Sequence, residues 1–250
     1  MRIRYLFLLA LILLAACGKK GPVRPLETLR PGAPTALELH QQGEALLLGW
    51  QLPTQNMDGS GIKQPPLLDI YRLTFDPRDN CLECPDRSIL WHSINPEFPD
   101  PAQRVGARYL IRDRQLQAGS GYQYKLVPRN AAGENGRAVI LRQIFTTPLT
   151  APGQFSAAAQ DSSVKLSWQA VSLPPDALLL GYQVYRRQDA GGATPYPINP
   201  KPVQQISFED FSLQNGSRYH YRVRALIKRG EQQLEGLSTE ELAVIPRTGL

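Results

Sequence analysis

The sequence predicts an all-β protein built from sandwiches of short antiparallel strands. The 250 residues include 22 prolines and 20 glycines, a share that favours turns and strands over helices. Hydrophobic residues make up 42% of the chain, which is enough for packed cores. Several segments alternate apolar and polar side chains with a period of two, as a strand with one buried face does.

Charge and composition exclude several classes of protein. With 42% hydrophobic and only 20% charged residues, neither a disordered chain nor a protein with many membrane spans fits. The formal charge of +6 is spread along the chain without a long basic run. We therefore expect no nucleic-acid partner.

The chain begins with the features of an export signal. Arg2 and Arg4 precede an apolar stretch over residues 5–16, which is too short to span a bilayer as a helix of about 20 residues. Residues 14–18 are Leu-Ala-Ala-Cys-Gly and resemble the lipobox of bacterial lipoprotein precursors. The resemblance implies that residues 1–16 are a signal peptide and that Cys17 becomes the lipidated N-terminus, carrying palmitate or similar acyl chains. The alternative is an ordinary export signal with an incidental cysteine.

Residues 17–31 are expected to form a tether between the lipid and the folded part. They contain Pro22, Pro25 and Pro31 without apolar periodicity, which is typical of a semi-rigid linker. Two or three acyl chains suffice for stable membrane anchoring. Gly18 follows the cysteine, and the resemblance to enterobacterial lipoproteins implies export to the cell outer membrane. The sequence leaves open which side of that membrane the protein faces.

An internal repeat divides the rest of the chain into two units. Ala33-Pro34 and Trp50 recur as Ala151-Pro152 and Trp168, both 118 residues later. A second set recurs 97 residues later: Asp113, Leu116, Gly119, Ser120, Tyr122 and Tyr124 correspond to Asp210, Leu213, Gly216, Ser217, Tyr219 and Tyr221. The repeat predicts two homologous domains, at residues 32–148 and 149–250.

Each unit is expected to form a sandwich of antiparallel strands. Residues 45–51 and 163–169 both end in Trp-Gln and are predicted to form strands. The next predicted strand is 70–75 in the first unit and 181–187 in the second. Farther on, apolar residues at 219, 221, 223 and 225 alternate with His220, Arg222 and Arg224. The period of two predicts that the first set is buried and that the basic set faces solvent.

The aromatic positions of both units are similar to those of fibronectin type III domains. The matching residues are Trp50, Tyr71 and the pattern from Leu116 to Tyr124 in the first unit, and Trp168, Tyr182 and the pattern from Leu213 to Tyr221 in the second. The resemblance implies two tandem immunoglobulin-like β-sandwiches. It also implies that Tyr122 and Tyr219 occupy the tyrosine corner, where the hydroxyl bonds an upstream backbone group. The first unit departs from the pattern at Pro128 and in its long, proline-rich middle.

Cys81 and Cys84 are open to three interpretations: half of a zinc site, a redox dithiol or a structural disulfide. A structural zinc site needs four ligands, and the chain has no second cysteine pair. A thioredoxin-like dithiol needs a helix N-terminus in a βαβ unit, whereas this pair lies in a proline-rich stretch of an all-β unit. An oxidising compartment favours a disulfide, and the lipidated Cys17 leaves these two cysteines as a pair. We expect a Cys81–Cys84 disulfide.

The long middle of the first unit, residues 76–104, also carries aromatic side chains. Trp91 and Phe98 lie among several prolines and either present a surface to a partner or pack onto the first sandwich. Large apolar groups are usually buried, so we expect both to pack.

The sequence favours a binding role over catalysis. It contains neither a Gly-x-Ser-x-Gly nor a His-Glu-x-x-His motif, and His40, His92 and His220 lie in unrelated settings. We expect no catalytic residue, metal or cofactor, and a partner that is an envelope protein or a glycan. Lys125, Arg222 and Arg224 give their strands a basic face, which is open to contact with an anionic glycan but is expected to be solubilising. The alternatives are a glycan-binding adhesive module and a redox accessory that uses Cys81 and Cys84.

Overall fold

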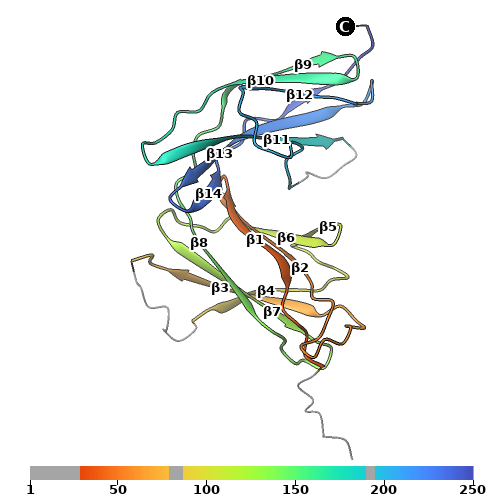
Figure 1. The fold of residues 1–250 in the computed structure, drawn as a ribbon, viewed down its shortest axis with the longest axis vertical. Helices are drawn as coiled ribbons and strands as arrows, with labels where there is room; N and C mark the ends of the chain where they lie inside the picture. Colours follow the sequence, from red (N-terminus) through yellow and green to blue (C-terminus); the bar gives the residue numbers. More distant parts are fainter. Residues whose placement is uncertain (1–28, 79–86, 190–194, 250) are drawn as a thin grey trace, which may run out of the picture.

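The computed structural model describes residues 29–78, 87–189 and 195–249, and the elements named within them are all β-strands, as predicted. The strands form two groups that follow one another along the long axis of the molecule (Figure 1). We call residues 29–148 the N-terminal half and residues 149–249 the C-terminal half. Each half contains its own cluster of buried hydrophobic side chains.

The N-terminal half packs two layers of strands against each other. One layer is formed, in spatial order, by β1 (Thr35–Gln42), β2 (Ala45–Gln51), β6 (Arg108–Asp113) and β5 (Gln103–Val105). The other is formed by β4 (Ile89–Ile94), β3 (Leu67–Phe75), β7 (Gly121–Arg129) and β8 (Val139–Ile144). The inward residues of β2 and β6, with Trp50 fully buried, pack on those of β3 and β7.

The C-terminal half repeats this arrangement. One sheet has the order β12 (Ser207–Asp210), β10 (Ser163–Gln169) and β9 (Gly153–Gln160). It faces β11 (Ala177–Gln188) and β13 (Tyr219–Arg229), which pair with each other, while β14 (Gln232–Glu235) and β15 (Leu242–Val244) both pair with β13. Trp168 of β10 packs edge-on against Tyr182 of β11. The strands predicted over 70–75 and 181–187 extend further in the structure, as β3 and β11.

Alternate residues of β13 divide between the core and the outer face of its sheet. Tyr219, Tyr221, Val223 and Ala225 are buried in the C-terminal core, as their period predicted. His220, Arg222 and Arg224 therefore point to the other side of the same strand. That outer face is where the two halves meet.

A parallel strand pair joins the halves. The end of β1 pairs with β14, so that Gln41 lies opposite Leu234 and Gln42 opposite Glu235. The pair makes β1 and β14 neighbours in one eight-stranded sheet that runs through both halves. Gly43 follows with a φ of +60° and donates a hydrogen bond of 2.9 Å to the Glu235 carbonyl. A Cβ atom at this position would lie 2.7 Å from Nη1 of Arg224, which would have to move, and the positive φ favours glycine here.

The long middle of the N-terminal half, residues 76–104, contributes β4, which forms one edge of its sheet. Trp91 of β4 packs on the core, with its ring centroid 5.6 Å from that of Tyr124. Phe98 was expected to pack as well, but it is 76% exposed, because its short turn between β4 and β5 directs it away from the sandwich. Cys17, Cys81 and Cys84 lie outside the described residues.

The same buried polar contacts occur in both halves. The Tyr122 hydroxyl accepts a hydrogen bond of 2.6 Å from the Gln117 backbone N–H, and the Tyr219 hydroxyl accepts one of 3.0 Å from the Gln214 N–H. The hydroxyls of Tyr124 and Tyr221 donate to the carboxylates of Asp113 and Asp210, at 2.6 and 2.7 Å. Each of these carboxylates also pairs with an arginine, Arg72 at 2.6 Å and Arg186 at 2.9 Å.

Candidate functional site

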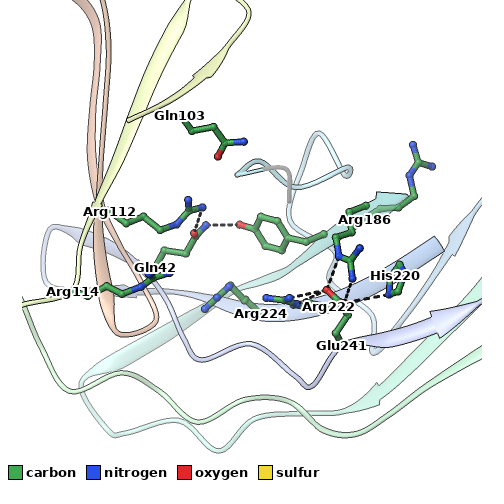
Figure 2. Close-up of a pocket in the computed structure, with 11 residues that line it drawn as sticks. Gln42, Gln103, Arg112, Arg114, Arg186, His220, Arg222, Arg224 and Glu241 are labelled. Atoms are coloured by element: carbon green, nitrogen blue, oxygen red, sulfur yellow. Dashed lines mark hydrogen bonds and ion pairs between the residues drawn. The ribbon is translucent and has the colours of Figure 1, made fainter. Parts of the chain in front are cut away.

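A cleft lined with arginine side chains lies where the two halves meet. Its cavity has a volume of about 280 Å³. Besides His220, Tyr185, two glutamines and one glutamate, the lining consists of six arginines: Arg112, Arg114, Arg186, Arg187, Arg222 and Arg224. Figure 2 shows Arg112 and Arg114 on one side of the cleft, Arg222, His220 and Glu241 on the other, and Arg224 between them.

The N-terminal half supplies one wall through the end of β6. Tyr109, Ile111 and Asp113 face the core of that half, so Arg112 faces outward, and Arg114 follows two residues later. Arg112 is partly buried, and burial together with the neighbouring charges of Arg114 and Arg224 lowers the pKa of its guanidinium. Arg114 is exposed at the side of the cleft.

The C-terminal half supplies the other wall through the outer face of β11 and β13. The register of this pair places Gln183 opposite Arg224, Tyr185 opposite Arg222 and Arg187 opposite His220. Alternation along both strands thus gathers basic and polar side chains on one surface. The pairing of β1 with β14 then brings this surface to the end of β6.

A chain of hydrogen bonds crosses the bottom of the cleft from one half to the other. Nη2 of Arg112 donates to Oε1 of Gln42 at 3.1 Å, and Nε2 of Gln42 donates to the Tyr185 hydroxyl at 3.1 Å. That hydroxyl donates to the Glu235 carboxylate at 2.7 Å, and burial and this carboxylate raise the pKa of Tyr185. Nη1 of Arg224 donates to the Gly236 carbonyl at 2.7 Å, while its Nε lies 3.8 Å from Glu235.

The carboxylate of Glu241 contacts three basic side chains of the wall formed by the C-terminal half. Glu241 accepts hydrogen bonds from Arg187 and, at 2.7 Å, from Arg222, and lies 3.2 Å from Nδ1 of His220. The hydrogen bond from Arg187 and the charge of Arg222 lower the pKa of Glu241 to about 2. The other ring nitrogen of His220 contacts Asp189, which Arg218 shares.

The arginines of the cleft outnumber the acids that neutralise them. Six guanidinium groups line it, and among the described residues their ion pairs join them to three carboxylates, those of Asp210, Glu235 and Glu241. With His220 neutral, the excess is +3. Within the described part of the chain, Arg112 and Arg114 have no carboxylate within 4.0 Å. A positive excess in a partly enclosed cavity favours an anionic ligand.

This cleft corrects one expectation from the sequence. His220 and Arg224 were expected on a solvated strand face, but both are half-buried: His220 contacts Asp189 and Glu241, and Arg224 contacts the Gly236 carbonyl and Glu235. Arg222 remains exposed. Arg112 and Arg114 were not singled out from the sequence, although they stand at alternate positions around Asp113, a residue of the internal repeat. Their two-residue spacing was the signal in the sequence that could have indicated two arginines on the same side of the chain.

The two tyrosines singled out for the tyrosine corner lie outside the cleft. Tyr122 and Tyr219 are buried in the two cores. Among residues 29–78, 87–189 and 195–249, no three His, Cys, Asp or Glu side chains are grouped so that they could hold a metal ion. In the same ranges there is no helix with the length and apolar character needed to cross a membrane.

Comparison with known proteins identifies a family for the C-terminal half. Residues 150–240 match the family model of the fibronectin type III domain, so this part of the chain contains such a domain. Exoglucanase B of Cellulomonas fimi is 24% identical over 236 residues, which are 90% of this chain. The chain spans only 18% of the length of that relative.

Solved structures with similarity to the chain include the chicken CNTN1 FN1–FN3 domains, at 17% identity and a TM-score of 0.36 over 88% of this chain and 69% of that one. A second is a myokine structure, at 18% identity and a TM-score of 0.32, which covers 40% of this chain and 99% of that one.

Proposed function

We propose that this protein is a lipid-anchored, non-catalytic binding protein of the bacterial cell envelope, and that it binds an anionic group in the cleft between its two halves. The lipobox-like sequence at Cys17 supports the anchor, and Gly18 supports the outer membrane as its location. The observation that carries the binding role is the excess of +3 in a cavity of about 280 Å³. Arginine binds carboxylate and phosphate groups through paired hydrogen bonds.

The construction of the cleft supports binding rather than a fortuitous charge patch. Residues of both halves form it, and the pairing of β1 with β14 fixes their relative position. Arg112 and Arg224 are held in place by Gln42 and the Gly236 carbonyl, at 3.1 and 2.7 Å. Guanidinium groups that are already oriented lose less side-chain entropy when a ligand binds.

The anchor is tested by Cys17→Ser. We expect the variant to move from the membrane fraction to the soluble periplasmic fraction, because residues 5–16 are too short to hold the chain in a bilayer. The measurement is fractionation of intact cells followed by immunoblotting. Retention of the variant in the membrane fraction would contradict the lipid anchor.

The binding site is tested by removing two charges from the cleft. Arg112→Gln with Arg114→Gln should weaken retention on an anionic resin in 0.15 M salt more than Lys63→Gln with Arg137→Gln. The control pair removes the same charge from exposed residues outside the cleft. Equal loss in both variants would mean that only net charge matters, and the cleft would not be the site.

A glycan-binding role is a second candidate, favoured by the similarity to a segment of Exoglucanase B. On the outer face of the N-terminal half, Tyr71 lies between Leu90 and Lys125, whose Nζ is 5.8 Å from the ring centroid of Tyr71. The ring of Tyr71 offers an aromatic face on which a sugar ring can stack. Tyr71→Ala should then reduce the retardation of the protein in gels that contain a soluble glucan, whereas Arg112→Gln with Arg114→Gln should not.

A further inference from the structure

We propose that the cleft between the two halves is a site for a phosphomonoester group, held between Arg112 and Arg114 of the N-terminal half and Arg224 of the C-terminal half. This inference rests on the proposed anion-binding function and names the chemical class of the ligand. The class follows from the charge of the cleft, the arrangement of its donors and its size.

The charge of the cleft favours an anion that carries two charges. The lining arginines exceed their carboxylate partners by three. A carboxylate or a sulfate ester brings one negative charge, while a phosphomonoester brings about 1.5 to 2 at pH 7. The phosphomonoester therefore neutralises more of the excess. Because Arg112 is partly buried beside Arg114 and Arg224, its own charge is destabilised until such a partner arrives.

The donors are arranged for a group with several acceptor oxygens. Arg112 uses Nη2 to bond Gln42, and Arg224 uses Nη1 to bond Gly236, so each has further N–H groups. Arg114 has no hydrogen bond or ion pair within the described residues. Arg112 and Arg114 lie on one side of the cleft, and Arg224 lies between its two sides (Figure 2). The three terminal oxygens of a phosphomonoester allow contact with all of them at once, whereas a carboxylate has two oxygens in one plane.

The remaining arginines frame the site rather than compete for the ligand. Arg187 and Arg222 share the carboxylate of Glu241, and Arg186 is bound to Asp210. The cavity of about 280 Å³ lies just below the usual range for ligand pockets, about 300 to 1,000 Å³. It accommodates a phosphate and the first ring attached to it, but not a folded polymer.

The test uses the full chain with Cys17→Ser and three ligands that share a sugar ring: glucose 6-phosphate, glucose 6-sulfate and glucuronate. Binding is measured by calorimetry at pH 7.5 and 5.0. We expect the phosphate to bind at least about tenfold more tightly than the other two at pH 7.5. Its advantage should shrink at pH 5.0, because its second pKa is about 6. The ratio of the affinities for the three ligands at each pH is the quantity to compare.

Variants locate the site. Arg112→Gln with Arg114→Gln should abolish the preference for phosphate, and Arg114→Gln alone, at an exposed position, should weaken it without affecting folding. Lys63→Gln with Arg137→Gln should leave it unchanged. Thermal unfolding of each variant without ligand separates loss of the site from loss of the fold.

Two further probes distinguish a lipid headgroup from a soluble ligand. Vesicles containing phosphatidic acid present a phosphomonoester, and vesicles containing phosphatidylglycerol present a phosphodiester. If the protein sediments only with vesicles that contain phosphatidic acid, and glucose 6-phosphate competes with this binding, the ligand is a lipid headgroup. If the protein binds glucose 6-phosphate but neither kind of vesicle, the ligand is a soluble phosphomonoester. Equal affinity for all three sugars would overturn the phosphomonoester inference and leave the anion-binding function standing. Binding of none of the probes would overturn both.

Discussion

Single hydroxyl groups fix the path of the chain at equivalent points of the two halves. Tyr122 and Tyr219 are almost fully buried, and each accepts a backbone N–H five residues upstream, at 2.6 and 3.0 Å. The sequence pattern had singled out both tyrosines for this role. Because each bond satisfies a backbone donor inside a partly buried turn, its loss leaves that donor without a partner.

Tyr219→Phe should destabilise the C-terminal half by about 1 to 3 kcal/mol, because it removes only the acceptor of the Gln214 N–H and preserves the ring. The measurement is urea denaturation followed by fluorescence. Tyr122→Phe serves as the matched variant and should lower the stability of the N-terminal half by a similar amount. No measurable change in either variant would show that the hydroxyl is not required.

Glu241 should make the stability of the protein depend on pH in the acid range. The hydrogen bond from Arg187 lowers its pKa to about 2, from 4.5. A carboxylate with a lowered pKa stabilises the folded state fully above its unfolded pKa, and this contribution is lost as the pH falls from about 4.5 toward 2.

Glu241→Gln should therefore be less stable than the parent protein at pH 7, and the difference should narrow as the pH falls from 4.5 to 2.5. Urea midpoints across this range give the comparison. Glu240→Gln, at a neighbouring exposed carboxylate, is the control and should leave the pH dependence in place. A constant difference at all pH values would contradict the ion pair with Arg187.

At the scale of elements, a bulge in β11 allows the segment at Val203 to pack beside the strand. The register of β11 against β13 shifts between Leu179 and Gly181, and Tyr182 exchanges backbone hydrogen bonds of 2.8 and 2.9 Å with Val203. Gly181 has a φ of +129°, and a Cβ atom there would lie 2.7 Å from the Val203 carbonyl oxygen. Both the backbone conformation and the space require glycine.

Gly181→Ala should cost about 2 to 5 kcal/mol, the sum of backbone strain and overpacking. Gly216→Ala is the matched control: its φ of +82° is also positive, but nothing lies within 4 Å of the added Cβ. Its cost should be limited to about 1 to 2 kcal/mol of backbone strain. Equal stabilities of the two variants in thermal unfolding would show that the close contact with Val203 relaxes freely.

At the scale of the whole molecule, the two halves have separate cores and a shared sheet. The pairing of β1 with β14 is accompanied by polar contacts between the halves: Gln42 donates to the Glu235 carboxylate at 3.2 Å, and Tyr196 donates to Glu38 at 3.2 Å. The molecule is therefore expected to bend little at the junction, since bending would break a buried network as well as a linker.

Residues 149–250 expressed alone should fold cooperatively into a β-rich domain, because the C-terminal core lies entirely within them. Their urea midpoint should be lower than that of the same half in the full chain, since β14 loses β1, one of its two partner strands, and Glu235 loses Gln42. Circular dichroism of fragment and full chain gives both quantities. An unfolded fragment would contradict an independent C-terminal core.

The sequence by itself determined the all-β fold and the local structure of each half, because strand alternation, turn residues and core aromatics are local signals. The buried set at 219, 221, 223 and 225 of β13 and the core positions of Trp50 and Trp168 follow from them. The tertiary structure alone decided the cleft. The pairing of β1 with β14 is parallel and joins residues almost 200 positions apart, and no turn between them signals it in the sequence. That pairing places Arg112 and Arg114 opposite Arg224, and so turns residues that look like ordinary surface charges into a site.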